Sequence, residues 1–208
     1  MKRMGKMKLF AVACIVALSA TVASAADMAP YVGGSVGLFM PTDSRITDNS
    51  GVSGDIEYNA GYSLSAVGGV EFNNGLRLEG ELTFKSAEMD KFTSGGTVNS
   101  DLSVLAALAS GYFDFKNTSP FTPYVGGGLG VATVYVGRIT NSTGFLLSNK
   151  DDDTVFAYQI GTGVGINVGS NVTLDLGYRY FGTTDPEFND FKAEFDSHNL
   201  LAGVRYKF

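Results

Sequence analysis

Polar and apolar residues alternate along several stretches of the chain, most clearly at its C-terminal end. From Asn199 to Phe208 the apolar residues fall on every second position, with Leu201 as the exception. Successive side chains of a β-strand point to opposite faces of a sheet. This stretch therefore predicts a strand with one fully apolar face, which indicates a wall that contacts lipid.

Similar alternation, or an apolar and glycine-rich run bounded by turn residues, predicts eight strands in all. They cover residues 30–40, 60–72, 76–85, 101–115, 122–136, 154–168, 172–182 and 196–208. Most reach the about 9–11 residues that a tilted strand needs to cross a bilayer. The fourth and fifth predicted strands are apolar on both faces, and the sequence leaves their inward side open.

Short and long connections alternate between the predicted strands. Links that contain turn residues follow the second, fourth and sixth strands, at 73–75, 116–121 and 169–171. Long polar links follow the other strands, at 41–59, 86–100, 137–153 and 183–195. Long structureless links are unusual in a compact soluble domain, whereas outer-membrane barrels combine short periplasmic turns with long extracellular loops. The pattern predicts an all-β fold, an eight-stranded antiparallel up-and-down transmembrane β-barrel with four long extracellular loops.

The first 25 residues have the three parts of a secretory signal peptide. Four basic residues precede an apolar run at 9–18, and the small residues 23–25 follow it. The run is shorter than the about 20 residues of a membrane-spanning helix. We expect cleavage between Ala25 and Ala26, which leaves a single barrel domain at 26–208.

The charge of the chain argues against one class of partner. It carries 15 Lys and Arg against 21 Asp and Glu, a net charge of −6. Loss of the four basic leader residues leaves 11 basic residues and a net charge of −10. Such an acidic chain is not expected to bind nucleic acid. Its single cysteine, Cys14, lies in the predicted leader, so disulfides are not expected to stabilise the exported domain.

Two further features favour lipid outside the barrel over the alternative of a soluble periplasmic or secreted β-domain. The polar strand faces are rich in glycine, which suits a narrow interior. Aromatic residues gather near the short turns, where an interfacial girdle would lie. These residues are Phe72, Phe113, Phe115, Phe121, Tyr124 and Phe208.

Charged residues recur on the polar faces of the third, seventh and eighth strands. They are Arg77, Glu79, Glu81, Asp175, Arg179, Arg205 and Lys207. Asp175 and Arg179 can pair with the two basic residues of the neighbouring last strand, and the glutamates can complete a network across the lumen. Unpaired charges there would cost several kcal/mol each. We expect these residues to cross-link the barrel interior, and ion conduction is the less favoured alternative.

Several short motifs together resemble a known family. They are PYVGGSVGLFMP at 30–41, GLRLEGEL at 75–82, GYFDF at 111–115, PYVGGGLG at 123–130, LGYRYFG at 176–182 and AGVRYKF at 202–208. In these the chain resembles the small eight-stranded outer-membrane barrels of the opacity-protein, OmpX and OmpA type. The resemblance implies a Gram-negative outer membrane, with outer-membrane lipid and lipopolysaccharide as surroundings. It also implies that Tyr206 and Phe208 are read by the outer-membrane assembly machinery.

Catalytic and metal-binding patterns are weak in this sequence. One barrel family hydrolyses lipid A with a His/Ser/Glu set whose serine lies two positions after the histidine. In this chain the residue two positions after His198 is Leu200. Ser197 is next to the histidine, but its side chain would face the opposite side of the strand. The acidic run 151–153, with Asp185, Glu187 and Asp190, lacks the spacing of a calcium loop. The glycines at 126–128 have no lysine or helix after them to bind phosphate. No catalytic residue, metal or cofactor is expected.

Three functions remain open from the sequence. The first is a structural or surface-interaction protein, most simply a monomer, whose acidic loops bind an unknown extracellular ligand. The second is a narrow channel for small or hydrophobic solutes, although an eight-stranded interior is about filled by side chains. The third, a lipid-modifying enzyme, is disfavoured by the missing serine.

Overall fold

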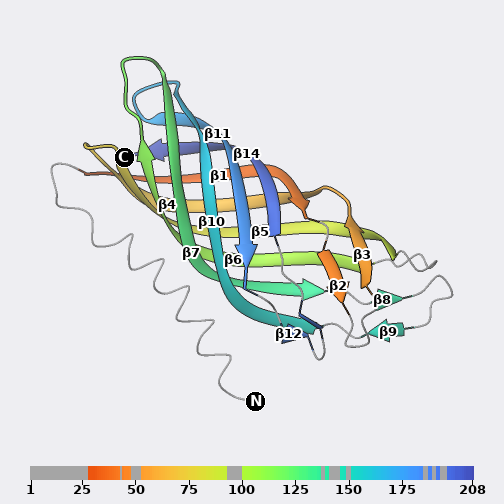
Figure 1. Ribbon diagram of the computed structural model, residues 1–208. Helices are drawn as coiled ribbons and strands as arrows, with labels where there is room; N and C mark the ends of the chain where they lie inside the picture. Colours follow the sequence, from red (N-terminus) through yellow and green to blue (C-terminus); the bar gives the residue numbers. More distant parts are fainter. Residues whose placement is uncertain are drawn as a thin grey trace.

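Eight long antiparallel strands form a closed barrel in the computed structural model (Figure 1). They are β1 (Met28–Pro41), β4 (Gly61–Phe72), β5 (Leu76–Phe92), β6 (Ser100–Asp114), β7 (Phe121–Val136), β10 (Asp151–Asn167), β11 (Val172–Thr183) and β14 (Asp196–Lys207). Each pairs with the next one along the chain, and β1 pairs with β14 to close the wall. This confirms the predicted eight-stranded up-and-down barrel.

The structure describes most, but not all, of the chain. The described residues are 28–42, 44–47, 53–92, 100–136, 139–140, 146–148, 151–184, 187–188, 191–192 and 196–208. Within these ranges, no helix has the length and apolar character to cross a membrane. The predicted signal peptide with its cleavage point between Ala25 and Ala26, and the acidic residues Asp185 and Asp190, lie outside them.

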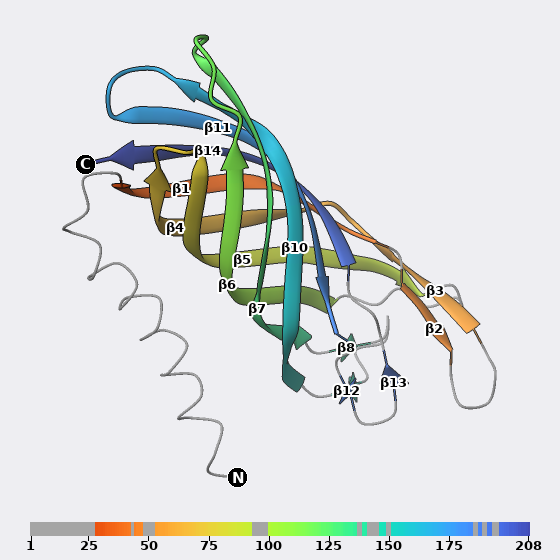
Figure 2. The same ribbon diagram turned by 60° about the vertical axis from the view of Figure 1, so that its left-hand side comes forward.

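Short strands occupy the long connections. They are β2 (Ser44–Thr47), β3 (Ser53–Tyr58), β8 (Ile139–Thr140), β9 (Leu146–Ser148), β12 (Glu187–Phe188) and β13 (Phe191–Lys192). The β2–β3 hairpin continues the sheet beyond the barrel wall, because β3 pairs with the last residues of β5 (Figure 2). The predicted long link at 41–59 thus contains two strands, and β5 runs seven residues past the predicted end at Lys85. The alternation fades there, but β3 and β6 on either side bond the backbone of the extension.

The three shortest connections between the eight barrel strands, and both ends of the described barrel, lie at one end, called here the turn end. The connections are 73–75, 115–120 and 168–171. Gly75 has a φ of +90°, a conformation that favours glycine. The Phe208 amide donates to the Pro30 carbonyl at 3.1 Å, and the Lys207 amide donates to the Asn171 carbonyl at 2.8 Å. The opposite end, with the longer connections, is called the loop end.

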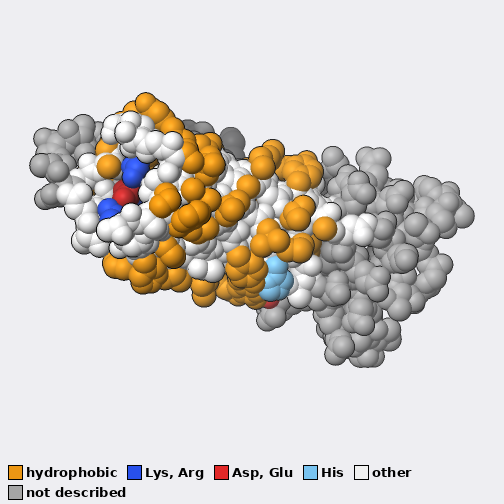
Figure 3. Space-filling view, turned by 90° about the horizontal axis from the view of Figure 1, so that it is seen from above, with side chains coloured by type: hydrophobic (Ala, Val, Ile, Leu, Met, Phe, Trp, Pro, Cys, Tyr) orange, Lys and Arg blue, Asp and Glu red, His pale blue; other side chains and the backbone are white. Residues whose placement is uncertain are grey.

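The two faces of the wall differ sharply in chemistry. Along β5, the odd-numbered residues from Arg77 to Ala87 are buried inside, while Leu76, Leu78 and Leu82 are exposed outside. Apolar side chains gather on the outer face in Figure 3. In a soluble barrel the apolar face would be the buried one. The wall therefore has the arrangement of a barrel surrounded by lipid.

The structure also assigns the inward face of the two strands that are apolar on both sides. On β6 the even-numbered residues from Leu102 to Asp114 are buried, and on β7 Tyr124, Ala132 and Val134 are buried. Both strands carry apolar residues inward because the loop-end half of the lumen is filled by an apolar layer. In this half of the barrel, inward and outward side chains still alternate along each strand, but both sets are apolar.

Candidate functional site: the barrel interior

The barrel interior has two layers. A polar layer occupies the turn-end half and contains Arg77, Glu79, Glu81, Tyr112, Asp114, Tyr124, Gln159, Asp175, Arg179 and Arg205. An apolar layer fills the loop-end half and contains Phe39, Ala87, Leu102, Val104, Ala106, Leu108, Ala132, Val134, Val155, Ala157 and Phe181. Together they fill the lumen across its width.

Arg77 on β5 is the centre of the first charge cluster. Its Nε lies 3.0 Å from Oδ2 of Asp114 on β6, and its Nη1 bonds Glu79 two residues along β5. Its guanidinium also lies over the rings of Tyr112 and Tyr124, 4.5 and 4.9 Å from their centroids. All three charged groups are at least nine-tenths buried, so their pairing offsets a large cost of desolvation.

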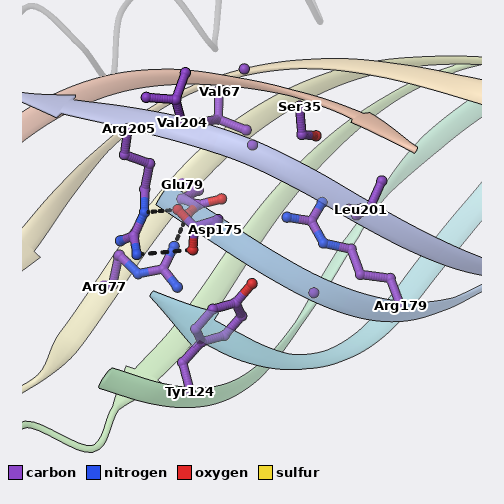
Figure 4. A pocket seen from close by; sticks show the side chains of 13 residues that line it. Ser35, Val67, Arg77, Glu79, Tyr124, Asp175, Arg179, Leu201, Val204 and Arg205 are labelled. Carbon is purple, nitrogen blue, oxygen red and sulfur yellow. Dashed lines mark hydrogen bonds and ion pairs between the residues drawn. The ribbon is translucent and has the colours of Figure 1, made fainter. Parts of the chain in front are cut away.

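Arg205 on β14 forms the second ion pair, with Asp175 on neighbouring β11. Its Nε lies 2.5 Å from Oδ2 and its Nη2 3.0 Å from Oδ1, so the contact uses both carboxylate oxygens (Figure 4). Bidentate arginine–carboxylate contacts are among the strongest charge-assisted hydrogen bonds. This pair couples two adjacent strands of the wall.

Arg179 on β11 spans the lumen to Glu81 on β5. Its Nη1 lies 2.7 and 2.6 Å from the two carboxylate oxygens. Gln159 on β10 donates to the same glutamate at 3.0 Å and also to Ser110 on β6 at 3.0 Å. Three strands from opposite sides of the wall are thus connected through one carboxylate, and Gln159 adds β6 as a fourth.

Asp175 pairs with Arg205 of β14, as the sequence suggested. The suggestion that Arg179 pairs with the basic residues of β14 was wrong, because like charges repel, and Arg179 instead pairs with Glu81 across the lumen. Lys207 lies at the turn-end rim, 3.1 Å from Glu71 of β4, and Lys116 lies 3.0 Å from the same glutamate.

Three of the charged residues in these contacts were not singled out from the sequence: Glu71, Lys116 and Asp114. Asp114 was missed because the parity of its strand was ambiguous, and Glu71 because its strand carries little alternation. Lys85 lies on the same face of its strand as Arg77, so the sequence could also have placed its side chain in the barrel interior. The pairing itself depends on side chains from distant parts of the chain.

Lys85 on β5 lies where the two layers meet. Its residue is 4% exposed, and its Nζ lies 3.6 Å from the ring centroid of Phe181 and 5.6 Å from that of Phe39. A cation over an aromatic face is attracted to the ring, more strongly when it is desolvated. Away from the rim, the inward side chains that the structure describes thus carry four basic groups and four carboxylates.

A small cavity of about 30 Å³ remains within the polar layer. Figure 4 shows Arg77, Arg179 and Arg205 with Glu79, Asp175 and Tyr124 around it. That volume has room for about one water molecule. Among the described residues, no three His, Cys, Asp or Glu side chains are arranged to hold a metal ion. The interior therefore offers room for a solvent molecule but not for an organic ligand.

The glycines of β7 make room for interior side chains. A Cβ at Gly126 would lie 2.5 Å from the Tyr112 ring and 2.2 Å from the Gly111 carbonyl, and a Cβ at Gly128 would lie 2.1 Å from the Ser110 hydroxyl. These positions fit the interpretation of small residues in a tight barrel.

His198 does not meet a serine partner on its strand. Its Nδ1 lies 2.6 Å from the Tyr178 hydroxyl on the outer face. Ser197 points inward, is fully buried, and its Oγ accepts a hydrogen bond from Asn199 at 3.3 Å. Leu200, two residues after the histidine, is exposed on the outside. The nucleophile and base of a hydrolase are not brought together by these residues.

The C-terminal aromatic pair lies on the outer face at the turn end. The rings of Tyr206 and Phe208 make an edge contact with centroids 5.5 Å apart. Their exposed fractions are 47% and 71%. Both side chains are thus presented to the surroundings and not to the interior.

Comparison with known proteins agrees with this architecture. The chain is 27% identical to the candidate adhesin RP828 of Rickettsia prowazekii, and the alignment covers 98% of this chain and 99% of that one. It is 31% identical to an opacity protein, opA57, of Neisseria gonorrhoeae over 48% of this chain and 50% of that one. The chain spans about half the length of the uncharacterized Brucella abortus relative BAB2_0314.

A solved structure and a family model extend the comparison to the fold. The crystal structure of Neisserial surface protein A superposes with a TM-score of 0.58 and 27% identity, covering 86% of this chain and 97% of that one. The model of the outer membrane protein β-barrel domain matches residues 10–208. The chain belongs to this family of outer-membrane β-barrel proteins.

Proposed function

We propose that this protein is a surface-interaction protein whose barrel anchors binding loops in the outer membrane. One observation carries the proposal: paired charges and apolar side chains fill the lumen, so the long connections are left as the functional part. In this proposal the barrel is oriented with its loop end outside the cell and its turn end in the periplasm. Loops held by a rigid scaffold are a common place for binding residues.

The charge and the relatives of the chain support this proposal. In each of the four predicted long links, acidic residues outnumber basic ones. A basic patch on an extracellular protein or host surface is therefore the complementary partner. RP828, which aligns over nearly the whole chain, is named as a candidate adhesin. No cofactor is needed for such binding, and a single barrel is sufficient to present the loops.

Replacing each long connection in turn by a short Gly-Ser link tests this function. Whole cells that display the variants would be assayed for binding to host cells, serum proteins and a surface layer. We expect loss of binding from at least one replacement, while the barrel still resists detergent unfolding. Binding that persists after all four replacements would overturn the proposal, because no loop would then be required.

A narrow channel is the second candidate function. Solute would have to displace the Arg179–Glu81 contact and pass the apolar layer, where Phe39 and Phe181 are fully buried. We expect planar bilayers with the purified protein to show little or no single-channel conductance. Large, stable conductance steps from the wild-type protein would favour the channel over the anchor.

A lipid-modifying enzyme is tested separately. The wild-type protein and His198→Ala would be expressed in cells, and the lipid A of both would be compared by mass spectrometry. We expect identical lipid A, because the Nδ1 of His198 is paired with Tyr178 and not with a nucleophile. A modification present only with the wild type would show an activity.

A further inference from the structure

A cluster of polar and aromatic side chains lies on the outer face near the loop end. It consists of Tyr158 on β10, Tyr178 and Tyr180 on β11, and Asp196 and His198 on β14, and is called here the tyrosine–histidine cluster. Pairing of Tyr180 with His198 brings two of the strands together at this point. In Figure 3 the chain's single histidine, pale blue, lies at the edge of the apolar outer surface.

The members of this cluster hold one another in place. The Tyr178 hydroxyl lies 2.6 Å from Nδ1 of His198, and the two rings stack with an angle of 27°. The Tyr180 ring lies 5.5 Å from the His198 ring and 6.4 Å from that of Tyr158. Asp196 and Tyr158 are side-chain hydrogen-bond partners of Tyr180. The cluster therefore offers fixed aromatic faces beside a carboxylate, an imidazole and three phenols.

A glycine leaves the space in which this arrangement forms. A Cβ at Gly182 would lie 2.5 Å from the Asp196 carboxylate and 2.5 Å from the Tyr158 hydroxyl. Any other residue at this position would push the two groups apart. The Asp196 carboxylate and the Tyr158 hydroxyl thus occupy the space above a position that carries no side chain.

An apolar groove begins next to the cluster and extends both toward the turn end and sideways around the wall. Tyr178 pairs with Leu200, and Leu200 lines the groove together with Leu176 and Ala202. Val36 and Leu64 line it on β1 and β4. The groove continues past Ala202 to Val204 on β14, and past Leu64 across β5 to Leu105 on β6. Ala202 has Val36 and Leu176 as its cross-strand neighbours, so its small side chain leaves a depression between larger ones.

We propose that the cluster and the groove together bind one glycolipid of the surrounding outer-membrane leaflet. The tyrosine–histidine cluster takes the saccharide headgroup, and the groove takes one acyl chain. Aromatic faces stack on the apolar face of a sugar ring, and the carboxylate, imidazole and phenols bond its hydroxyls. An acyl chain fits the exposed apolar groove because both lie within the hydrocarbon layer.

The opposite end of the barrel shows what an ordinary interfacial girdle looks like. There, Tyr206 and Phe208 contact each other by ring edges. The tyrosine–histidine cluster differs by placing a carboxylate and an imidazole among its rings, next to a groove. The proposal rests on the orientation in the proposed function, in which the loop end reaches the outer leaflet.

The single histidine allows a direct test in solution. The full chain after leader removal, without a histidine tag, would be refolded in detergent micelles and titrated with lipopolysaccharide or with phosphatidylethanolamine. The imidazole resonances of His198 would be followed by NMR. We expect saturable shifts with lipopolysaccharide and smaller, nonsaturating shifts with the phospholipid. This measurement does not depend on what the loops bind. Lipid binding can therefore fail while the surface-interaction function holds, and the surface-interaction function can fail while lipid binding holds.

Two variants separate the headgroup from the acyl chain. Tyr180→Phe removes one hydroxyl and should weaken lipopolysaccharide binding about tenfold, the loss expected for one buried hydrogen bond, without changing phospholipid binding. Ala202→Phe fills the groove and should weaken binding of both lipids. The matched controls are Tyr206→Phe at the turn end and Ala109→Phe on the far wall, where Ala109 is also exposed; neither should have an effect.

Three outcomes would overturn the proposal. Equal shifts with both lipids would show an ordinary interfacial girdle, and no shift with either would show no site. A dimer in analytical ultracentrifugation that Ala202→Phe converts to a monomer would show that a second copy covers the groove. Should Ala202→Phe fail to fold, Tyr180→Phe still decides the headgroup contact, because this conservative change leaves the wall intact.

Discussion

Arg179 on β11 and Glu81 on β5 meet across the lumen, with Nη1 of the arginine 2.6 Å from Oε2 of the glutamate. The two residues are 98 positions apart in the chain. The glutamate side chain is 2% exposed and the arginine side chain 14%. Each group is therefore desolvated, and each depends on the other for compensation.

Arg179→Ala should destabilise the barrel because it leaves Glu81 as a buried charge without its cation. Removing one member of a buried pair typically costs about 3–5 kcal/mol, and water in the polar layer should reduce that cost. Urea unfolding of the refolded protein in detergent would measure it. Glu79→Gln should also lower stability, through its contact with Arg77.

A rim pair provides the control for this experiment. Lys116→Ala removes a contact with Glu71 whose lysine side chain is 41% exposed. Exposed pairs typically contribute about 0–1 kcal/mol, so we expect little change. Equal losses from Arg179→Ala and Lys116→Ala would contradict the idea that burial gives the interior pair its importance.

Opening the apolar layer should require removal of its rings. Phe39 and Phe181 are both fully buried, and the Lys85 ammonium lies over both rings. We expect Phe39→Ala combined with Phe181→Ala to give small conductance steps in planar bilayers where the wild type gives none. Phe156→Ala, which removes a lipid-facing ring, is the control and should stay silent. Steps of the same size in all three proteins would mean that the layer does not block the lumen.

Phe208→Ala, or deletion of Phe208, should lower the amount of assembled barrel while export continues. The residue directly follows the closing strand β14 and is exposed, and it resembles the family's signal for the assembly machinery. Quantitative immunoblots of outer-membrane and periplasmic fractions would measure assembly. Phe115→Ala removes another exposed turn-end ring away from the C-terminus and should assemble normally. Normal levels of the deletion variant would contradict this role.

Gly126→Ala should destabilise the barrel, since the added Cβ would approach the Gly111 carbonyl to 2.2 Å and the Tyr112 ring to 2.5 Å. Overpacking of this kind typically costs about 1–3 kcal/mol. The shift in gel mobility between unboiled and boiled protein, followed over temperature, would measure the loss. Gly68→Ala is the matched control, because a Cβ there has nothing within 4 Å. Equal melting of the two variants would argue against tight packing at Gly126.

The alternation of side chains determined much of the architecture from the sequence alone. Strand number, chain order and most strand boundaries followed from a period of two and from the short turns, because these signals are local. The same parity placed Arg77, Glu81 and Arg179 inside. The residues next to them in the chain point outward and are mostly apolar, as contact with lipid requires.

Only the tertiary structure decided the ion-pair partners, the inward side of two strands and the length of β5. The partner of Arg179 depends on which side chain faces it across the closed lumen, and closure is a property of all eight strands together. The inward side of β6 and β7 was ambiguous because an apolar interior layer and a lipid-facing wall demand the same residues. The extension of β5 depends on β3, whose backbone pairing leaves no local pattern in the sequence. The outer tyrosine–histidine cluster likewise exists only where three strands bring Tyr158, Tyr180 and His198 together, since none of them is a neighbour of another in the chain.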